Sequence, residues 1–135
     1  MPDSDTYTGD IGSLVPFAGR LGIEITDASP DEVRGRMPWA EDLCTVAGVM
    51  HGGALMAFAD TLGAACASLN LPPGALTTTI ESKSNFFRPV TSGEATGVTT
   101  PLHVGRRTIV VQTTIHRDDG KPVAIVTQTQ AVLEA

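Results

Sequence analysis

One carboxylate stands alone in an otherwise uncharged stretch of this sequence. Asp60 is the only charged side chain between Gly53 and Ile80, and the residues at helical spacing around it are mostly small. A carboxylate on such a face costs free energy unless something hydrogen-bonds it, and it can serve there as a general base or a nucleophile. The alternative is that Asp60 faces water or pairs with an arginine of the sheet.

A second candidate site precedes this stretch, where His51, Gly52 and Gly53 open an apolar segment. The first N–H groups of a helix have no partner within it, and the positive end of the helix dipole favours negative charge. The N–H of Gly52 is therefore suited to stabilise a developing oxyanion. His51 either orients the loop or the substrate, or caps the helix, and the two glycines alternatively form a plain tight turn.

The spacing of these two candidates constrains how they can act together. Gly52 and Asp60 are eight residues apart, which is about 12 Å along one helix axis. They cannot both touch one carbonyl group. If both act on the same substrate, the N–H comes from one chain and the carboxylate from another, across a two-fold axis. The spacing therefore predicts an obligate dimer with two equivalent sites.

The element that must carry these residues is a long helix over residues 52–70, ended by the run Pro72-Pro73-Gly74. It is apolar on nearly every side, so one chain's sheet covers only part of it. Strand patterns follow one another without helices between them, which favours an antiparallel α+β fold with five to six strands. The other predicted elements are a short helix at 11–19, a hairpin of 21–26 and 32–38, a loop at 39–49, and strands at 76–87, 92–104, 107–116 and 122–133.

The strand over residues 107–116 has the clearest pattern. Ile109, Val111, Thr113 and Ile115 fall on one face, which is the period of two expected for a strand. The turn signal Asp118-Asp119-Gly120 joins it to the last strand as an antiparallel hairpin.

Length and composition limit the class of protein. The chain of 135 residues is 41% hydrophobic and 18% charged, as expected for one globular domain. We assign residues 11–135 to this domain and residues 1–10, acidic and without a basic residue, to a frayed end.

A net charge of −6 argues against nucleic-acid and membrane partners. Cys44 and Cys66 have neither a CxxC pattern nor a histidine at metal spacing, so we expect free thiols, no metal and a cytoplasmic location.

Several motifs taken together resemble a known family. They are the stretch 48–53 (GVMHGG) followed by Asp60, then 85–89 (NFFRP), 105–108 (GRRT) and 119–121 (DGK). This ordered set resembles the hotdog-fold acyl-CoA thioesterases of the phenylacetic-acid-degradation and 4-hydroxybenzoyl-CoA thioesterase type. The resemblance covers roughly residues 21–133 and implies a long central helix wrapped by a curved antiparallel sheet, with chains paired into homodimers and often homotetramers.

The resemblance also implies roles for individual residues. Asp60 matches the catalytic carboxylate, which activates water or attacks the thioester directly, and Gly52 matches the residue whose N–H polarises the thioester carbonyl, with His51 beside it. Where the family often has Asn or Gln six residues before the histidine, this chain has Thr45, which is shorter and lacks an amide. A hydroxyl on the strand after the helix is implied as well, from Thr78 or Thr79.

Coenzyme A is implied only as part of the substrate, with no further cofactor. Its phosphates need a local cation in an acidic protein, and Arg88, Arg106 and Arg107 are the candidates. Consecutive residues of an extended chain point in opposite directions, so at most one of Arg106 and Arg107 faces the ligand. The alternative for each arginine is a solvated surface position.

The function predicted from this reading is hydrolysis of an acyl-CoA thioester to a free acid and coenzyme A. Two alternatives stay open. An enoyl-thioester hydratase shares the fold but needs an Asp and a His that act as a pair on the substrate. This alternative is disfavoured, because His51 lies at the N-terminal end of the helix, beside the N–H donor. The best support for a non-catalytic acyl-CoA binding protein is Thr45, which stands where the family often has the amide side chain of Asn or Gln. Met56, Phe58, Phe86 and Phe87 are candidates to line an acyl pocket.

Overall fold

The computed structural model describes residues 3–134 of the chain. Met1, Pro2 and Ala135 lie outside the described residues, and the prediction of a frayed end falls partly on them. Within the part of that end that is described, Ser4–Thr6 form a 3-10 helix (η1) and Gly9–Asp10 form a two-residue strand (β1). Because β1 pairs with the next strand of the sheet, this end has backbone partners that the acidic composition does not reveal.

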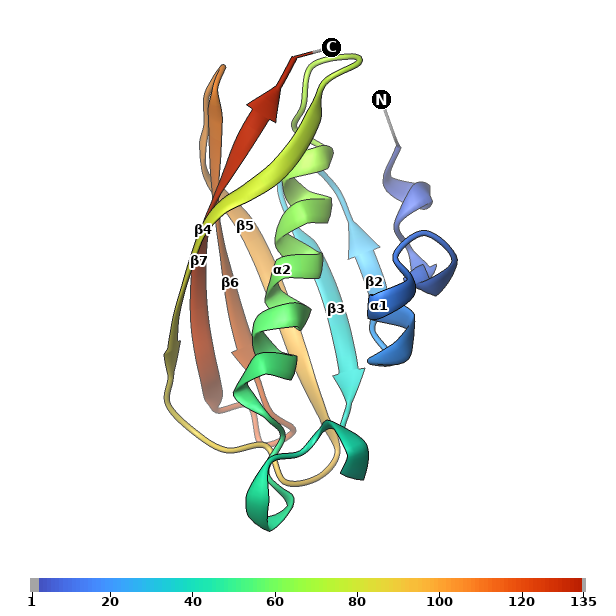
Figure 1. The fold of residues 1–135 in the computed structure, drawn as a ribbon, viewed down its shortest axis with the longest axis vertical. Helices are drawn as coiled ribbons and strands as arrows, with labels where there is room; N and C mark the ends of the chain where they lie inside the picture. Colours follow the sequence, from blue (N-terminus) through green and yellow to red (C-terminus); the bar gives the residue numbers. More distant parts are fainter. Residues whose placement is uncertain (1–2, 135) are drawn as a thin grey trace.

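The central helix α2 spans Gly52–Ser68 and confirms the long helix predicted from the sequence. Its buried residues include Leu55, Phe58 and Leu62. Figure 1 shows α2 lying along one face of the curved sheet, with the N-terminal segment on the side of α2 away from β4. One face of the helix is thus covered by the sheet, and the exposed residues of α2, Gly53, Met56 and Asp60, lie on another side.

The sheet is antiparallel throughout, with the strand order β1-β2-β3-β5-β6-β7-β4. Six of its strands have five or more residues, which agrees with the five to six strands predicted from the sequence. The seventh, β1, adds two residues at one edge. The strand that follows α2 in sequence, β4, forms the other edge. The long strands are β2 (Glu24–Ala28), β3 (Val33–Pro38), β4 (Leu76–Phe86), β5 (Glu94–Val104), β6 (Thr108–His116) and β7 (Pro122–Leu133).

The alternation predicted for β6 is confirmed, since Ile109, Val111, Thr113 and Ile115 are all buried against α2. The predicted turn follows, with Gly120 at φ 80°, a left-handed conformation that glycine adopts without strain. It connects β6 to β7 as an antiparallel hairpin.

Close contact between α2 and the sheet depends on two glycines of neighbouring strands. A Cβ at Gly35 would lie 2.7 Å from Leu62 Cδ2, and one at Gly97 would lie 2.6 Å from Leu62 Cδ1. The ring of Phe58 lies against the same two glycines and is fully buried. The assignment of Phe58 to an acyl pocket is therefore wrong, because this ring belongs to the core.

Two other differences from the prediction concern local boundaries. The helix predicted at 11–19 is divided into a 3-10 turn, Ile11–Ser13 (η2), and a short helix α1, Pro16–Arg20, because proline is favoured in the first turn of a helix. The predicted loop at 39–49 contains two 3-10 turns, Glu41–Leu43 (η3) and Val46–Gly48 (η4). No helix within residues 3–134 has the length and apolarity needed to cross a membrane.

The buried thiol of Cys66 gives the fold a testable pH dependence. Both cysteines are free, and burial, with a smaller effect of the Asp31 carboxylate, raises the pKa of the Cys66 thiol from 9.0 to about 11. Above pH 9 the unfolded chain loses this proton while the folded chain keeps it. The stability contributed by the protonated thiol is therefore complete below pH 9 and lost as the pH rises through about 11.

We expect the free energy of unfolding to fall more steeply with pH in the wild type than in Cys66→Ala over this interval. Urea unfolding of both chains at about pH 8 and about pH 10 measures the difference. Equal falls in the two chains would contradict the assignment to Cys66.

Candidate active site

Asp60 lies in the middle of α2 and is hydrogen-bonded by two donors from the sheet. Its Oδ1 accepts from Thr79 Oγ1 at 2.8 Å and from Gln128 Nε2 at 2.7 Å. The side chain is otherwise exposed in the single chain, and no arginine within residues 3–134 forms an ion pair with it. Of the two threonines considered from sequence, Thr79 is the one that contacts Asp60, whereas Thr78 is exposed.

Two glutamines that sequence reasoning did not single out complete this network. Gln128 and Gln130 lie on β7 with exposures of 1% and 0%. Gln130 Nε2 donates to Thr79 Oγ1 at 2.9 Å, so one glutamine contacts Asp60 directly and the other contacts it through Thr79. A signal for them was present in the sequence, because the alternation of β7 places both amides at inward positions that normally hold apolar residues.

The N-terminus of α2 is capped by the side chain of His51. Its Nδ1 accepts a hydrogen bond from the N–H of Gly53 at 2.7 Å, so the capping interpretation of this histidine describes the single chain. The cap engages the Gly53 N–H, whereas the N–H of Gly52 has no acceptor among the described residues. Gly52 therefore presents the unpaired donor that the sequence analysis assigned to it.

A cavity of about 310 Å³ opens beside this N-terminus. A Cβ at Gly52 would lie 3.4 Å from the ring of Phe86, so this glycine borders the aromatic wall. Thr45 and Arg88 also line the cavity, and Arg88 Nη1 donates to the carbonyl oxygen of Pro122 at 2.9 Å. The remaining lining residues are Val49, Met50, Leu55, Phe87 and Pro89.

Asp60 borders two other cavities. One, of about 240 Å³, is lined by Met56, Ala57, Asp60, Thr79 and Ser82 and lies toward β4. The other, of about 330 Å³ and largely apolar, lies between α2 and the N-terminal segment. Neither contains Gly52, so a single chain does not bring the donor and the carboxylate to one point.

Arg106 and Arg107 lie far from the cavity at Gly52. They occupy the turn between β5 and β6 and are exposed, and Figure 1 places this turn (orange) at the end of the molecule opposite the N-terminus of α2. Within one chain, Arg88 is therefore the only one of the three predicted phosphate ligands that lines the cavity at Gly52.

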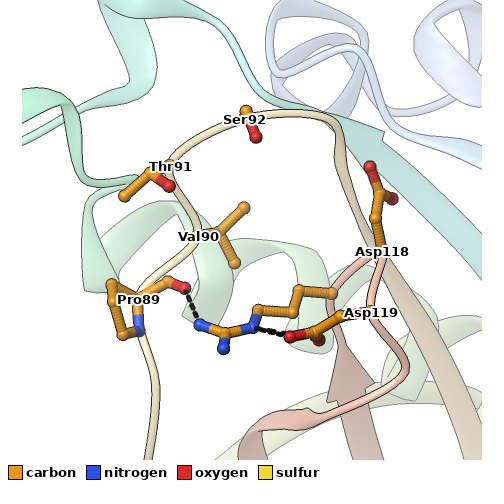
Figure 2. Close-up of a pocket in the computed structure, with 7 residues that line it drawn as sticks. Pro89, Val90, Thr91, Ser92, Asp118 and Asp119 are labelled. Atoms are coloured by element: carbon orange, nitrogen blue, oxygen red, sulfur yellow. Dashed lines mark hydrogen bonds and ion pairs between the residues drawn. The ribbon is translucent and has the colours of Figure 1, made fainter.

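A further arginine, Arg117, connects the loop after β4 with the turn between β6 and β7. Its guanidinium donates to the carbonyl oxygen of Pro89 at 3.0 Å and to the carboxylate of Asp119, also at 3.0 Å. Figure 2 shows Pro89 and Asp119 among the residues that line the cavity here. The hydrogen bond from Arg117 lowers the pKa of Asp119, with help from the Lys121 N–H. Because Val90 in the same loop accepts the N–H of Met50, Arg117 supports the segment that leads into α2.

Comparison with known proteins agrees with this architecture. A sequence model described as the Thioesterase superfamily matches residues 47–124, which is more than half of the chain. The chain belongs to the thioesterase superfamily. The matched region includes the N-terminus of α2, Asp60 and Thr79, and it ends before the two glutamines of β7.

Relatives of this thioesterase-superfamily chain extend over most of its length. The proofreading thioesterase EntH of Cronobacter turicensis is 32% identical over 111 residues, which cover 82% of this chain and 79% of the relative. The crystal structure of a thioesterase from Haemophilus influenzae has a TM-score of 0.83 at 32% identity and covers 87% of this chain and 82% of that chain. A mutant thioesterase from Pseudomonas aeruginosa has a TM-score of 0.90 at 27% identity, covering 100% and 96%. These likenesses identify the hotdog fold and support thioester hydrolysis as the activity.

Proposed function

We propose that this thioesterase-superfamily chain hydrolyses acyl-CoA thioesters, with Asp60 as the catalytic carboxylate and the Gly52 N–H as the donor to the thioester carbonyl. The observation that carries the proposal is the Asp60 carboxylate, which is held by two donors on an otherwise uncharged helix and borders open cavities. The unpaired N–H of Gly52, beside its own cavity, supplies the second group that the chemistry needs.

In this mechanism the Asp60 carboxylate takes a proton from water while the water oxygen bonds to the thioester carbon. The Gly52 N–H stabilises the negative charge on the carbonyl oxygen as that bond forms. When the carbon–sulfur bond breaks, the proton passes from Asp60 to the coenzyme A thiolate. In the alternative nucleophilic route, Asp60 itself bonds to the acyl carbon, the thiolate leaves, and water then hydrolyses the anhydride.

The two groups meet when two chains pair. In the single chain β4 is an edge strand, and it carries the exposed apolar side chains of Leu76 and Ile80, which are 70% and 62% exposed. An unpaired edge with such residues favours association with another strand. We therefore assign the site to a homodimer, or a homotetramer built from it, in which Gly52 of one chain faces Asp60 of its partner.

Substrate recognition follows from the same assembly. We assign Arg88 to the coenzyme A phosphates at the cavity beside Gly52, and Arg106 or Arg107 to phosphates held from the partner chain. The motif set favours the phenylacetic-acid-degradation and 4-hydroxybenzoyl-CoA thioesterase type of superfamily member, acting in the cytoplasm, where Cys44 and Cys66 stay reduced.

Turnover of a small panel of aromatic and aliphatic acyl-CoAs tests this function. We expect release of the coenzyme A thiol, detected with a thiol reagent, for at least one acyl group. An enoyl-thioester hydratase would instead consume the double bond of an enoyl-CoA without releasing thiol. A non-catalytic binding protein would bind the acyl-CoAs and release no thiol, and either result would contradict the proposal.

A further inference from the structure

Two buried side chains of β7 are polar, although their positions face the core. Gln128 and Gln130 occupy inward positions of β7, where their neighbour at the same spacing, Val126, is apolar. A buried amide costs free energy unless it is hydrogen-bonded. The side chain of Gln128 makes one hydrogen bond within the described chain, to Asp60, and its buried Oε1 has no partner there. The contact with Asp60 is therefore the interaction that this glutamine provides.

The chemistry of the donors fixes the direction of each hydrogen bond. An amide nitrogen only donates, so Thr79 Oγ1 must accept from Gln130 Nε2. The hydroxyl has a single proton, which is then directed to Asp60 Oδ1. The other amide atom of Gln130, Oε1, lies 3.4 Å from Thr77 Oγ1, whose single proton is donated to the carbonyl oxygen of Ala131 at 2.8 Å. The buried glutamine thus makes Thr79 a donor toward Asp60.

Both donors converge on the same carboxylate oxygen. Thr79 and Gln128 both contact Oδ1, and Oδ2 has no hydrogen-bond partner among residues 3–134. Two donors at a single oxygen hold the plane of the carboxylate and leave the other oxygen to act as a base or nucleophile.

The helix leaves room for this arrangement at one position. Gly63 is buried and lies one turn after Asp60, and a Cβ added to it would overlap Gln128 Oε1. The same Cβ would lie 3.2 Å from Val111 Cγ2, so a side chain at this position would also meet β6. The absence of a side chain at Gly63 is thus what allows Gln128 to reach Asp60.

We propose that Gln128 and Gln130 are positioning residues that hold Oδ1 of Asp60, directly and through Thr79, so that Oδ2 is the reacting oxygen. The inference rests on the proposed thioesterase function of Asp60. It adds that kcat depends on the buried amides of Gln128 and Gln130 and on the space left by the missing side chain of Gly63.

The direct test is Gln128→Met, which keeps the length of the side chain, suits a buried position and removes the amide donor. The matched control is Gln112→Met on β6, because Gln112 Nε2 also donates to a threonine hydroxyl, that of Thr127 at 3.2 Å, but has no contact with Asp60. We expect Gln128→Met to lower kcat about 10- to 100-fold, the range of a hydrogen bond to a charged group, with KM nearly unchanged. Gln112→Met should leave both constants near the wild type.

Gly63→Ala tests the same contact from the helix. Alanine favours the helix more than glycine does, so a fall in kcat with α2 intact by circular dichroism would reflect displacement of the Gln128 amide. Because both changes break one hydrogen bond, adding Gly63→Ala to Gln128→Met should cause little further loss of kcat. If Gln128→Met fails to fold, Gly63→Ala alone still tests the proposal.

The outcomes separate this inference from the proposed function. Wild-type kcat in folded Gln128→Met or in folded Gly63→Ala, with an active wild type, would overturn the positioning role and leave the thioesterase function intact. Equal losses in Gln128→Met and Gln112→Met would also overturn it, because they would reflect a general effect on the sheet. A wild type that hydrolyses no acyl-CoA would overturn both proposals.

Discussion

Asp60→Asn is expected to lower kcat by about 10²- to 10⁴-fold, the usual contribution of a positioned general base. The substitution changes little else. The asparagine carbonyl oxygen can still accept from Thr79 and Gln128, as Oδ1 of Asp60 does, and only the other oxygen becomes an NH₂ group without basicity. KM should change little, because coenzyme A is bound through contacts remote from this side chain.

Steady-state kinetics on the best acyl-CoA of the panel measures the effect. Asp42→Asn is a suitable control, because Asp42 is an exposed carboxylate of η3 that lines none of the cavities at the candidate site. A kcat for Asp60→Asn close to that of the wild type, with the fold intact, would exclude Asp60 as base or nucleophile.

The parts of the fold that were predictable from sequence are those set by local periodicity and turn chemistry. The alternation from Ile109 to Ile115 fixes β6 and its inward face, and Gly120 marks the hairpin that follows. The apolar run from Gly52, ended by the proline pair, fixes α2. Such signals lie within about ten residues of the structure they determine, so no knowledge of tertiary contacts is needed.

The parts that were missed depend on contacts distant in sequence. Gln128 meets Asp60 across 68 residues and Gln130 meets Thr79 across 51, and both contacts exist only because β7 lies between β6 and β4 in the sheet. Phe58 was misassigned for a related reason, since only the approach of Gly35 and Gly97 shows that its ring is in the core. A helix pattern alone does not distinguish a side facing the sheet from a side facing a cavity.

Gly52→Val should also abolish most turnover, by a different mechanism. Gly52 has helical backbone geometry that valine can adopt, and the atoms nearest to an added Cβ belong to the Phe86 ring, at van der Waals distances from 3.4 Å, so the fold should survive. The branched side chain would occupy the space beside the N–H donor and block the approach of a carbonyl. Loss of one oxyanion donor costs about 10²- to 10³-fold in kcat, while binding of free coenzyme A, measured by calorimetry, should be nearly unchanged.

Mixing Gly52→Val with Asp60→Asn tests whether the donor and the carboxylate belong to different chains. In a heterodimer of the two, one site combines the intact Gly52 of one chain with the intact Asp60 of the other, and the second site has both substitutions. Random exchange gives half heterodimers with one working site each, so the mixture should recover about one quarter of wild-type activity. If both groups acted from one chain, no site in any dimer would be intact.

Two controls make this complementation decisive. Light scattering should first show each parent as a dimer or larger, and mass spectrometry of differently tagged chains should show that subunits have exchanged. Recovery of activity then requires a site shared across the two-fold axis, because each parent is inactive by itself. If exchange is complete and activity stays at the parental level, the shared site is wrong even when acyl-CoA hydrolysis by the wild type is established, and the 12 Å between Gly52 and Asp60 along α2 would then mean that only one of the two residues acts on the thioester.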